Sequence, residues 1–238
     1  MRSLAGRLGQ VCINGKQIWR SQIKLYYFAV NKPKGYICSA KPLYEDERTA
    51  ISLMNDWLEQ WKARNPEKPV PRLFTVGRLD VQSVGLIFIT NDGEWASRMI
   101  HPSYGLTKEY NVTLTRRPLP SEMRRLAQSV EVEPGVRVTP VSVSLDESRP
   151  GESARVRIVL SEGRTHEIRK LVATAGLNLK TLRRTRIGDY RLPKEVPFGS
   201  FVRLTRPEAW NLVKRKKVPD QAPVMVSRGG QESDDEEM

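Results

Sequence analysis

The fold is decided by the stretch Phe74-Thr-Val-Gly-Arg-Leu-Asp-Val-Gln-Ser-Val-Gly-Leu-Ile-Phe-Ile-Thr90, because it predicts two short strands and the loop that joins them. Phe74–Val76 is typical of a strand, and so is Leu86–Thr90, which begins with the apolar run Leu86–Ile89 of the length of a buried strand. Gly77 and Gly85 bracket the residues between them, and glycine is typical of tight turns. Reactive groups are well placed on short loops that a rigid sheet supports.

One ionisable residue of this loop is a candidate for catalysis. Asp80 follows Arg78 by two residues, and a nearby cation favours the ionised form of a carboxyl group. An ionised carboxylate can act as a nucleophile or as a base, and it is unsuited to the role of general acid. The alternative is a turn aspartate that bonds backbone amides, and the spacing alone favours this alternative.

Outside this stretch, short helices and strands follow one another irregularly. Such a mixture predicts an α+β domain rather than a doubly wound parallel sheet. We expect further strands at Leu25–Val30, Tyr110–Leu114, Val136–Val143 and Ala154–Leu160, and helices at Ile51–Ala63, Glu94–Ile100, Ser121–Ser129 and Thr165–Ala175.

The last of these helices belongs to the segment Glu162-Gly-Arg-Thr-His-Glu-Ile-Arg-Lys170. Thr165 is expected to cap the helix and Gly176 to end it. The face opposite the apolar stripe is cationic and contains His166, Arg169 and Lys170. Because a helix start also presents free backbone amides, a phosphate or a carboxylate would bind there. A solvated basic face explains the spacing equally well.

Two shorter motifs are weak on their own. Asn31-Lys-Pro-Lys-Gly35 is a turn-forming loop directly after a predicted strand, and its Lys32 and Lys34 could hold a phosphate. Lys108-Glu-Tyr110 opens another strand, and a tyrosine in that position is ordinarily a core or rim residue.

The composition favours a polyanionic partner. The 238 residues carry a net charge of +13 and a pI near 10.0, and each phosphate that a protein neutralises releases counterions. No apolar run approaches the roughly 18 residues of a membrane helix, so we expect a soluble protein with no membrane partner. Two cysteines and two histidines are too few and too scattered for a zinc site or a disulfide framework. The chemistry must therefore rest on carboxylates, hydroxyls and basic groups.

Both ends of the chain differ in composition from its middle. Residues 1–44 contain no Asp or Glu, as is usual in transit peptides, but Asn14-Gly15 is a strong tight-turn signal among strand-like residues, so we expect a folded start. From Lys214 onward, a basic run, small residues and an acidic end lack periodicity and predict a disordered tail.

Taken together, six motifs in a fixed order resemble one known family. They are Asn31–Gly35, Gly77–Leu86, Thr90–Gly93, Lys108–Tyr110, Glu162–Arg169 and Leu182–Gly188. The set resembles the small-subunit type of bacterial ribosomal RNA pseudouridine synthases and their relatives in plant organelles, over roughly residues 28–206. The resemblance implies an α+β catalytic fold with a mixed, largely antiparallel central sheet flanked by short helices and loops. It also implies isomerisation of a specific uridine in ribosomal RNA, with no metal and no organic cofactor.

The resemblance assigns a role to each matching residue. Asp80 matches the catalytic aspartate, and Arg78 matches the arginine that helps to hold the target base out of the RNA helix. Tyr110 matches the tyrosine that stacks on the uracil and is proposed to take the proton from carbon 5. Arg169 matches the basic residue that pairs with the aspartate, and Ile168 matches the aliphatic neighbour of the ring. The basic residues expected to contact the RNA are Lys32, Arg164 and His166.

The match also divides the chain. Residues 1–27 correspond to a remnant of an N-terminal RNA-binding module of the type found in a small-subunit ribosomal protein, residues 28–212 to the catalytic domain, and residues 213–238 to the tail. The expected partner is ribosomal RNA or a pre-ribosomal particle, and the expected state is a monomer. Resemblance to plant organelle relatives favours a chloroplast or a mitochondrion over the cytoplasm.

Alternatives stay open at this point. The shortened N-terminal module favours a non-catalytic RNA-binding factor for ribosome assembly on the same fold. A glycoside or nucleoside hydrolase that uses Asp80 with Glu162 would release free uracil. If the chain is a synthase, Asp80 either attacks the anomeric carbon or removes the neighbouring ribose proton, and the sequence does not choose between these routes.

Overall fold

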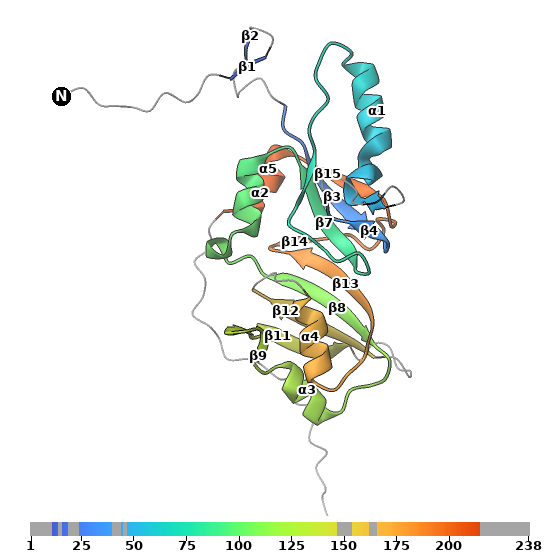
Figure 1. Cartoon of the computed structure of the whole chain (residues 1–238), viewed down its shortest axis with the longest axis vertical. Coiled ribbons are helices and arrows are strands. Elements are labelled where there is room, and N and C mark those ends of the chain that lie inside the picture. The colour runs from blue at the N-terminus through green and yellow to red at the C-terminus, as the bar shows by residue number, and fades with distance from the viewer. Residues whose placement is uncertain are drawn as a thin grey trace, which may run out of the picture.

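One nine-stranded sheet organises the described part of the chain (Figure 1). The structure is a computed structural model, and it describes residues 11–13, 16–18, 24–39, 44, 47–146, 154–161 and 166–214. The strands of the large sheet are β3 (Tyr27–Lys32), β6 (Phe74–Val76), β7 (Val84–Thr90), β8 (Lys108–Leu114), β11 (Ser142–Asp146), β12 (Arg155–Leu160), β13 (Leu179–Ile187), β14 (Tyr190–Arg191) and β15 (Phe201–Leu204). Their order is β11-β12-β8-β13-β7-β3-β15, with β14 paired to β13 and β6 paired to β7.

The sheet is mixed and largely antiparallel, as the resemblance implied. β7 and β13 are parallel, with Arg183 opposite Val84. The other neighbouring pairs of this sheet are antiparallel. Because β13 pairs with β8 along one edge and with β7 along the other, it joins the two halves of the sheet.

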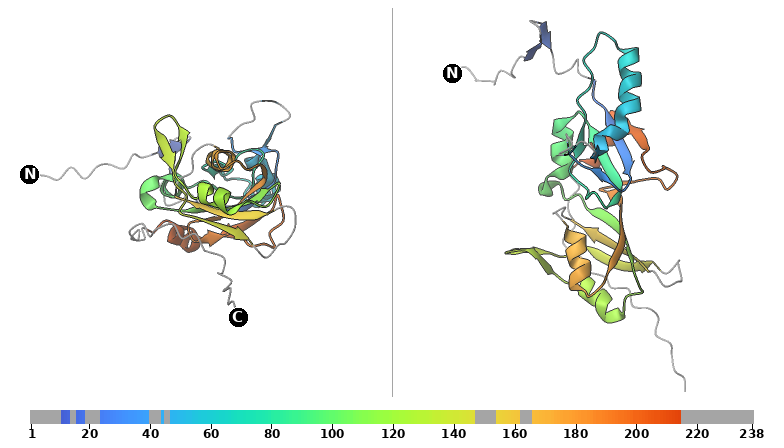
Figure 2. Two further views of the ribbon diagram at one scale, coloured as in Figure 1. Left: turned by 90° about the horizontal axis from the view of Figure 1, so that it is seen from below. Right: turned by 45° about the vertical axis from the view of Figure 1, so that its right-hand side comes forward.

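Helices cover both halves of the sheet. Within the described residues they are α1 (Asn55–Arg64), α2 (Gly93–Ile100), α3 (Pro120–Leu126), α4 (Glu167–Thr174) and α5 (Arg206–Leu212), with 3-10 turns η2 (Ala50–Met54) and η3 (Pro102–Tyr104). Figures 1 and 2 show α3 and α4 beside the half formed by β8, β11 and β12, and α1, α2 and α5 around the other half. No helix in the described ranges is long and apolar enough to cross a bilayer.

Three apolar clusters hold these layers together. The first lies between α4 and strands β8 and β12, the second between α2, α5 and the sheet, and the third beneath η2 and α1. Their fully buried members include Val112, Ile158 and Leu171 in the first, Phe88, Trp95 and Ala209 in the second, and Phe28, Met54 and Ile87 in the third. Burying each large side chain of this kind contributes about 1.5–3 kcal/mol.

Most expected elements are confirmed to within a few residues, and one strand is wrong. The expected strand Val136–Val143 is two strands, because β10 (Val136–Val138) pairs back onto β9 (Val130–Glu133) and the chain then enters β11. Pro140 lies between them, and proline cannot donate to a strand ladder. The sequence interpretation also missed β13, β15 and α5.

The smaller pairings involve short strands near the start of the chain. β1 (Val11–Ile13) and β2 (Lys16–Ile18) are antiparallel, with Ile13 opposite Lys16, so they flank the predicted turn at Asn14-Gly15 closely. β4 (Tyr36–Ile37) pairs in parallel with β5 (Arg48–Thr49). The predicted tail lies outside the described residues except for Val213 and Lys214.

The loop that carries Asp80 joins β6 to β7, as predicted. Gly85 has a φ of +104°, and a Cβ at that position would lie 2.2 Å from the Arg184 carbonyl oxygen of β13. Only glycine fits where the two backbones approach so closely. Gly85 therefore allows β13 to lie directly beside the end of the loop.

Candidate active site

A cleft of about 700 Å³ opens beside the loop of residues 77–83. Its walls come from this loop, from the end of α2, from β8 and β13, and from the start of α4. Six of the residues that the sequence singled out line it: Arg78, Asp80, Tyr110, His166, Ile168 and Arg169. Segments that lie 90 residues apart in the sequence therefore meet at one site.

Asp80 lies between two cationic or potentially cationic side chains from the start of α4. Its Oδ2 is 3.6 Å from Nε of Arg169, and its Oδ1 is 3.6 Å from Nε2 of His166. The carboxylate is 18% exposed, so it faces the cleft without being fully solvated. Its backbone is held by a tight turn in which the Ser83 amide donates to the Asp80 carbonyl at 3.0 Å. The carboxylate is thus oriented from two sides.

His166 adopts a conformation that costs free energy. It is the residue before α4, and its φ of 58° is in the left-handed region, where it is the one non-glycine residue found among the described residues. That conformation costs about 1–2 kcal/mol for a residue with a Cβ. It turns the imidazole toward Asp80, although more than half of the side chain stays exposed. The expected cap Thr165 and the expected RNA contact Arg164 lie outside the described residues.

Tyr110 and Ile168 form an apolar wall of the cleft. Their exposures are 7% and 4%, and both belong to the core cluster under α4. Burial raises the pKa of the Tyr110 hydroxyl, whereas the Arg184 guanidinium acts in the opposite direction. The hydroxyl is therefore protonated at neutral pH, and the neighbouring cation makes it a better acid than burial alone would allow.

Arg184 is a residue of the site that the sequence interpretation missed. It lies opposite Tyr110 across β13 and β8, lines the cleft and is only 4% exposed. Its Nε donates to the Leu86 carbonyl at 2.8 Å, and its Nη1 donates to the Arg78 carbonyl at 3.1 Å. Arg184 therefore fastens the Asp80 loop to β7. The Leu182–Gly188 motif contained it, but nothing in a run of basic residues indicates which arginine is buried.

Lys32 requires a correction. The sequence predicted that it holds a phosphate, but its side chain is fully buried. Its Nζ donates to the carbonyls of Tyr36 at 2.8 Å, Pro33 at 3.1 Å and Val81 at 3.5 Å, and burial lowers its pKa to about 8. Lys32 therefore connects its own turn to the Asp80 loop, while Lys34 stays exposed. Arg78 is also exposed, at the rim of the cleft.

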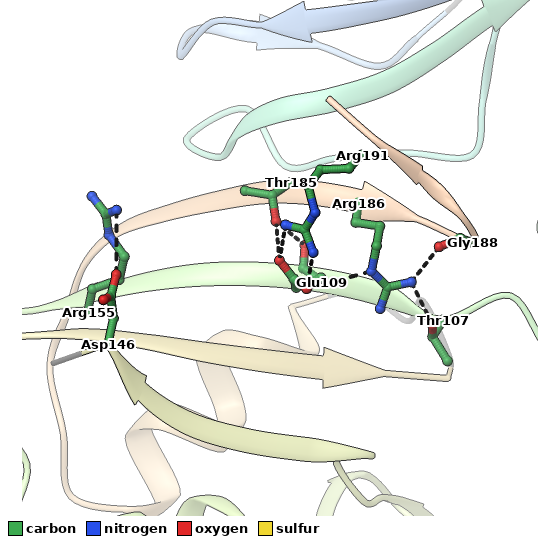
Figure 3. A network of polar contacts seen from close by, with 8 residues as sticks. All are labelled: Thr107, Glu109, Asp146, Arg155, Thr185, Arg186, Gly188 and Arg191. Atoms are coloured by element: carbon green, nitrogen blue, oxygen red, sulfur yellow. Dashed lines mark hydrogen bonds and ion pairs between the residues drawn. The ribbon is translucent and has the colours of Figure 1, made fainter. Parts of the chain in front are cut away.

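A buried carboxylate stabilises the strands behind Tyr110. Glu109 binds Arg191 through two hydrogen bonds of 2.6 and 2.7 Å, accepts a hydrogen bond of 2.9 Å from Thr185, and lies 3.6 Å from Nε of Arg186 (Figure 3). The Arg191 guanidinium is the main reason that the pKa of Glu109 falls to about 2. This network ties β8, β13 and β14 together next to the residue that lines the cleft.

Comparison with known proteins identifies the family. A sequence model described as RNA pseudouridylate synthase matches residues 26–174. The chain belongs to this family. A crystal structure of a pseudouridylate synthase has a TM-score of 0.63 and 28% sequence identity to this protein, over 79% of this chain and 74% of that chain.

Two relatives of known name have similar sequences. A putative ribosomal large subunit pseudouridine synthase of the chloroplast from Arabidopsis thaliana is 44% identical over 199 residues, which are 83% of this chain and 48% of that protein. The ribosomal small subunit pseudouridine synthase A of Escherichia coli strain K12 is 30% identical over 79% of this chain and 74% of that protein. The chain therefore spans about half the length of its chloroplast relative.

Proposed function

We propose that this synthase isomerises uridine to pseudouridine in ribosomal RNA and that Asp80 is its catalytic residue. The observation that carries the proposal is the Asp80 carboxylate in the cleft, 3.6 Å from both His166 and Arg169. The family supports the reaction class. The names of the relatives support ribosomal RNA as the substrate class, and they include both the large and the small subunit.

The reaction exchanges one bond for another at the same sugar carbon. The N1–C1′ bond of uridine breaks, the uracil turns while it stays bound, and C5 bonds to C1′. The proton on C5 leaves and N1 gains a proton, so no atom is added overall. Positive charge builds up on the sugar as the first bond breaks, and a carboxylate beside the sugar stabilises that charge.

Two routes use the Asp80 carboxylate. It can attack C1′ and hold the sugar as an ester, or it can remove the C2′ proton. In both routes Arg169 keeps the carboxylate oriented. A transcript that is deuterated at C2′ separates them, because only proton removal predicts a primary isotope effect on the rate of pseudouridine formation.

The other residues of the cleft handle the base. Flipping a uridine out of an RNA helix costs a few kcal/mol, and the exposed Arg78 at the rim can fill the vacated space. Tyr110 and Ile168 provide the platform that holds the free uracil while it turns. Since Tyr110 is protonated at neutral pH, its removal of the C5 proton would require the nearby Arg184 cation, which favours the phenolate.

The test compares purified wild-type protein with Asp80→Asn on transcripts of both ribosomal RNAs and on pre-ribosomal particles. Asp56→Asn on α1 is the matched control, because Asp56 is exposed and does not line the cleft. We expect one uridine to be converted by the wild type and by the control. Asp80→Asn should bind the RNA normally and lose about 10⁴-fold in rate, the size of loss seen when a catalytic aspartate is neutralised in other enzymes.

The alternatives predict other results. If wild-type protein never forms pseudouridine in either RNA or in particles, the proposal fails. Rescue of cells lacking the gene by Asp80→Asn as well as by wild type would favour the assembly-factor hypothesis. Accumulation of free uracil would favour a hydrolase.

We also propose a chloroplast or mitochondrial location, supported by the chloroplast relative, and a monomeric state. A fluorescent fusion of the full gene product in plant cells tests the first, and sedimentation of the purified protein tests the second. Residues 28–212 are proposed as the catalytic domain, and residues 1–27 as belonging to an RNA-binding module.

A further inference from the structure

Neighbouring arginines of β13 lie on opposite faces of the sheet. Arg184 points into the cleft and pairs with Tyr110 across β8, whereas Arg183 pairs with Asn111 and lies on the other face. Successive side chains of a strand point to opposite faces of the sheet, so two adjacent arginines lie on two different surfaces. The cleft uses Arg184. The function proposed above gives no role to Arg183.

Arg183 belongs to a row of polar side chains on the face away from α4. The register aligns Arg157 of β12 with Asn111 of β8 and Asn111 with Arg183. Arg155 and Thr113 form the next position of the same face. All five residues are partly or fully exposed, and we call them the back face. Neighbouring strands lie about 5 Å apart, so the backbones at Arg157 and Arg183 are separated by about 10 Å.

Within the part of the chain that the structure describes, the positive charge of the back face is only partly compensated. Asp146 lies 3.9 Å from Arg155, and Figure 3 shows this pair on the same side of the sheet as the Glu109 network. Glu109 is occupied by Arg191 and Arg186. Among the ion pairs of the described residues, none involves Arg157 or Arg183.

The Arg183 guanidinium lies in an unfavourable environment on the back face. Its Nε is buried and has no hydrogen-bond partner in the part of the chain that the structure describes. Burial and the nearby Arg155 both lower its pKa. A guanidinium that is partly desolvated next to a like charge becomes more stable when an anion binds it.

An exposed aromatic ring extends the row. Phe198, in the segment between β14 and β15, is 56% exposed, and the Arg183 guanidinium lies 5.5 Å from its ring centroid. Exposed aromatic rings beside arginines are the arrangement on which single-stranded nucleic acids stack their bases and bind their phosphates. A lone phosphate or an acidic peptide would make no use of the ring.

We propose that the back face with Phe198 is a second RNA-binding surface, separate from the cleft, which holds phosphates and one unpaired base of the same RNA substrate. The inference rests on the proposed function, because it takes RNA as the partner. The two surfaces lie on opposite faces of one sheet, so a folded RNA would reach both by wrapping around its edge. The back face adds affinity and leaves the chemical step unchanged.

The test measures binding of the full chain to ribosomal RNA transcripts as a function of salt. The variant is Arg157→Gln with Arg183→Gln. The control is Lys62→Gln with Arg72→Gln, which removes one exposed cation from α1 and one from the segment before β6. Each lost phosphate contact lowers the slope of log Kd against log salt by about 0.7–0.9. We expect the back-face variant to lose about 1.5 in slope and at least about tenfold in affinity at 0.1 M salt, with a smaller loss in the control.

A second pair of variants tests the ring. Phe198→Leu should weaken RNA binding at least about fivefold. Phe198→Tyr should bind RNA as tightly as the wild type, because stacking needs an aromatic face and not merely bulk. Single-turnover rates at saturating protein should equal the wild-type rate in all these variants. Equal affinity and equal slope in the back-face variant and in the control would overturn the proposal, even if the wild type forms pseudouridine. Loss of affinity together with a wild type that forms no pseudouridine would support the surface and refute the proposed function.

Discussion

Arg184→Gln is expected to slow pseudouridine formation about 10²-fold without unfolding the protein. Arg184 donates to the carbonyl of Arg78, which is two residues before Asp80, and to the carbonyl of Leu86 in β7. Glutamine is too short to reach both acceptors, so the loop loses its attachment on one side of the carboxylate. A displacement of about 1 Å at a reacting group costs about 10²-fold in rate, which is about 2.7 kcal/mol of transition-state stabilisation.

Arg184→Gln should lower the free energy of unfolding by less than the two lost hydrogen bonds alone suggest. Hydrogen bonds from a charged donor contribute about 1.5–3 kcal/mol each. The guanidinium is 4% exposed, however, and removing a buried charge recovers part of its desolvation penalty. We expect a net loss of about 2 kcal/mol, or about 4–8 °C in Tm for a domain of this size.

The assay is single-turnover pseudouridine formation with protein in excess, together with thermal unfolding followed by circular dichroism. Arg183→Gln is the matched control, since it removes the adjacent arginine from the opposite face, and its single-turnover rate should equal that of the wild type. If folded Arg184→Gln keeps a rate within about threefold of the wild type, Arg184 does not position the loop and the reasoning is refuted.

Three further outcomes are expected. Tyr110→Phe should bind RNA normally but release the C5 hydrogen of uridine at least about 10²-fold more slowly, as measured by tritium release from 5-labelled transcripts; an unchanged rate would assign the C5 proton to another base. The pKa of Glu109 is about 2 when folded and near 4.5 when unfolded, so its contribution is present above pH 4.5 and is lost as the pH falls toward 2. The stability advantage of wild type over Glu109→Gln, about 2 kcal/mol at pH 6, should therefore shrink in urea unfolding below pH 4.5; a constant difference would contradict this. The pKa of Lys32 is about 8 when folded and near 10.5 when unfolded, so the unfolded chain binds more protons between these values, and wild type should gain stability relative to Lys32→Met as the pH rises from 8 to 10.5. A stability difference between wild type and Lys32→Met that does not change from pH 8 to 10.5 would show that the Lys32 ammonium is not desolvated.

The loop at residues 77–83 could be predicted from the sequence because its signals are local. Two strand-like runs and two bracketing glycines define a turn between paired strands, and β6 and β7 form that pair. The helix at α4 was also predictable, since apolar residues recur at helical spacing and Gly176 ends it with a φ of +80°. Local signals of this kind do not depend on the rest of the fold.

The environments of the cationic residues were not predictable, because they depend on distant segments. Lys32 follows the strand that the sequence predicts and precedes proline, which is typical of an exposed turn. In the structure it ends β3, and the packing of Val81 and Tyr36 around its ammonium buries it. Arg184 is buried because β13 lies between β7 and β8 in the sheet, and a basic nonapeptide gives no sign of a central strand. Charge alone therefore led to a phosphate-binding prediction where the structure has a positioning residue.

These two buried cations explain how a short loop can hold a reactive carboxylate still. Lys32 binds the carbonyl of Val81, directly after Asp80, and Arg184 binds the carbonyl of Arg78, two residues before it. Burying a cation costs several kcal/mol that its hydrogen bonds only partly offset, and apolar residues in the same places would stabilise the fold more. Apolar contacts are not directional, however, whereas a hydrogen bond to each flanking carbonyl fixes the direction in which the Asp80 side chain leaves the backbone. The loop is therefore expected to keep its geometry when RNA binds, and the Asp80 carboxylate would meet the ribose already aligned.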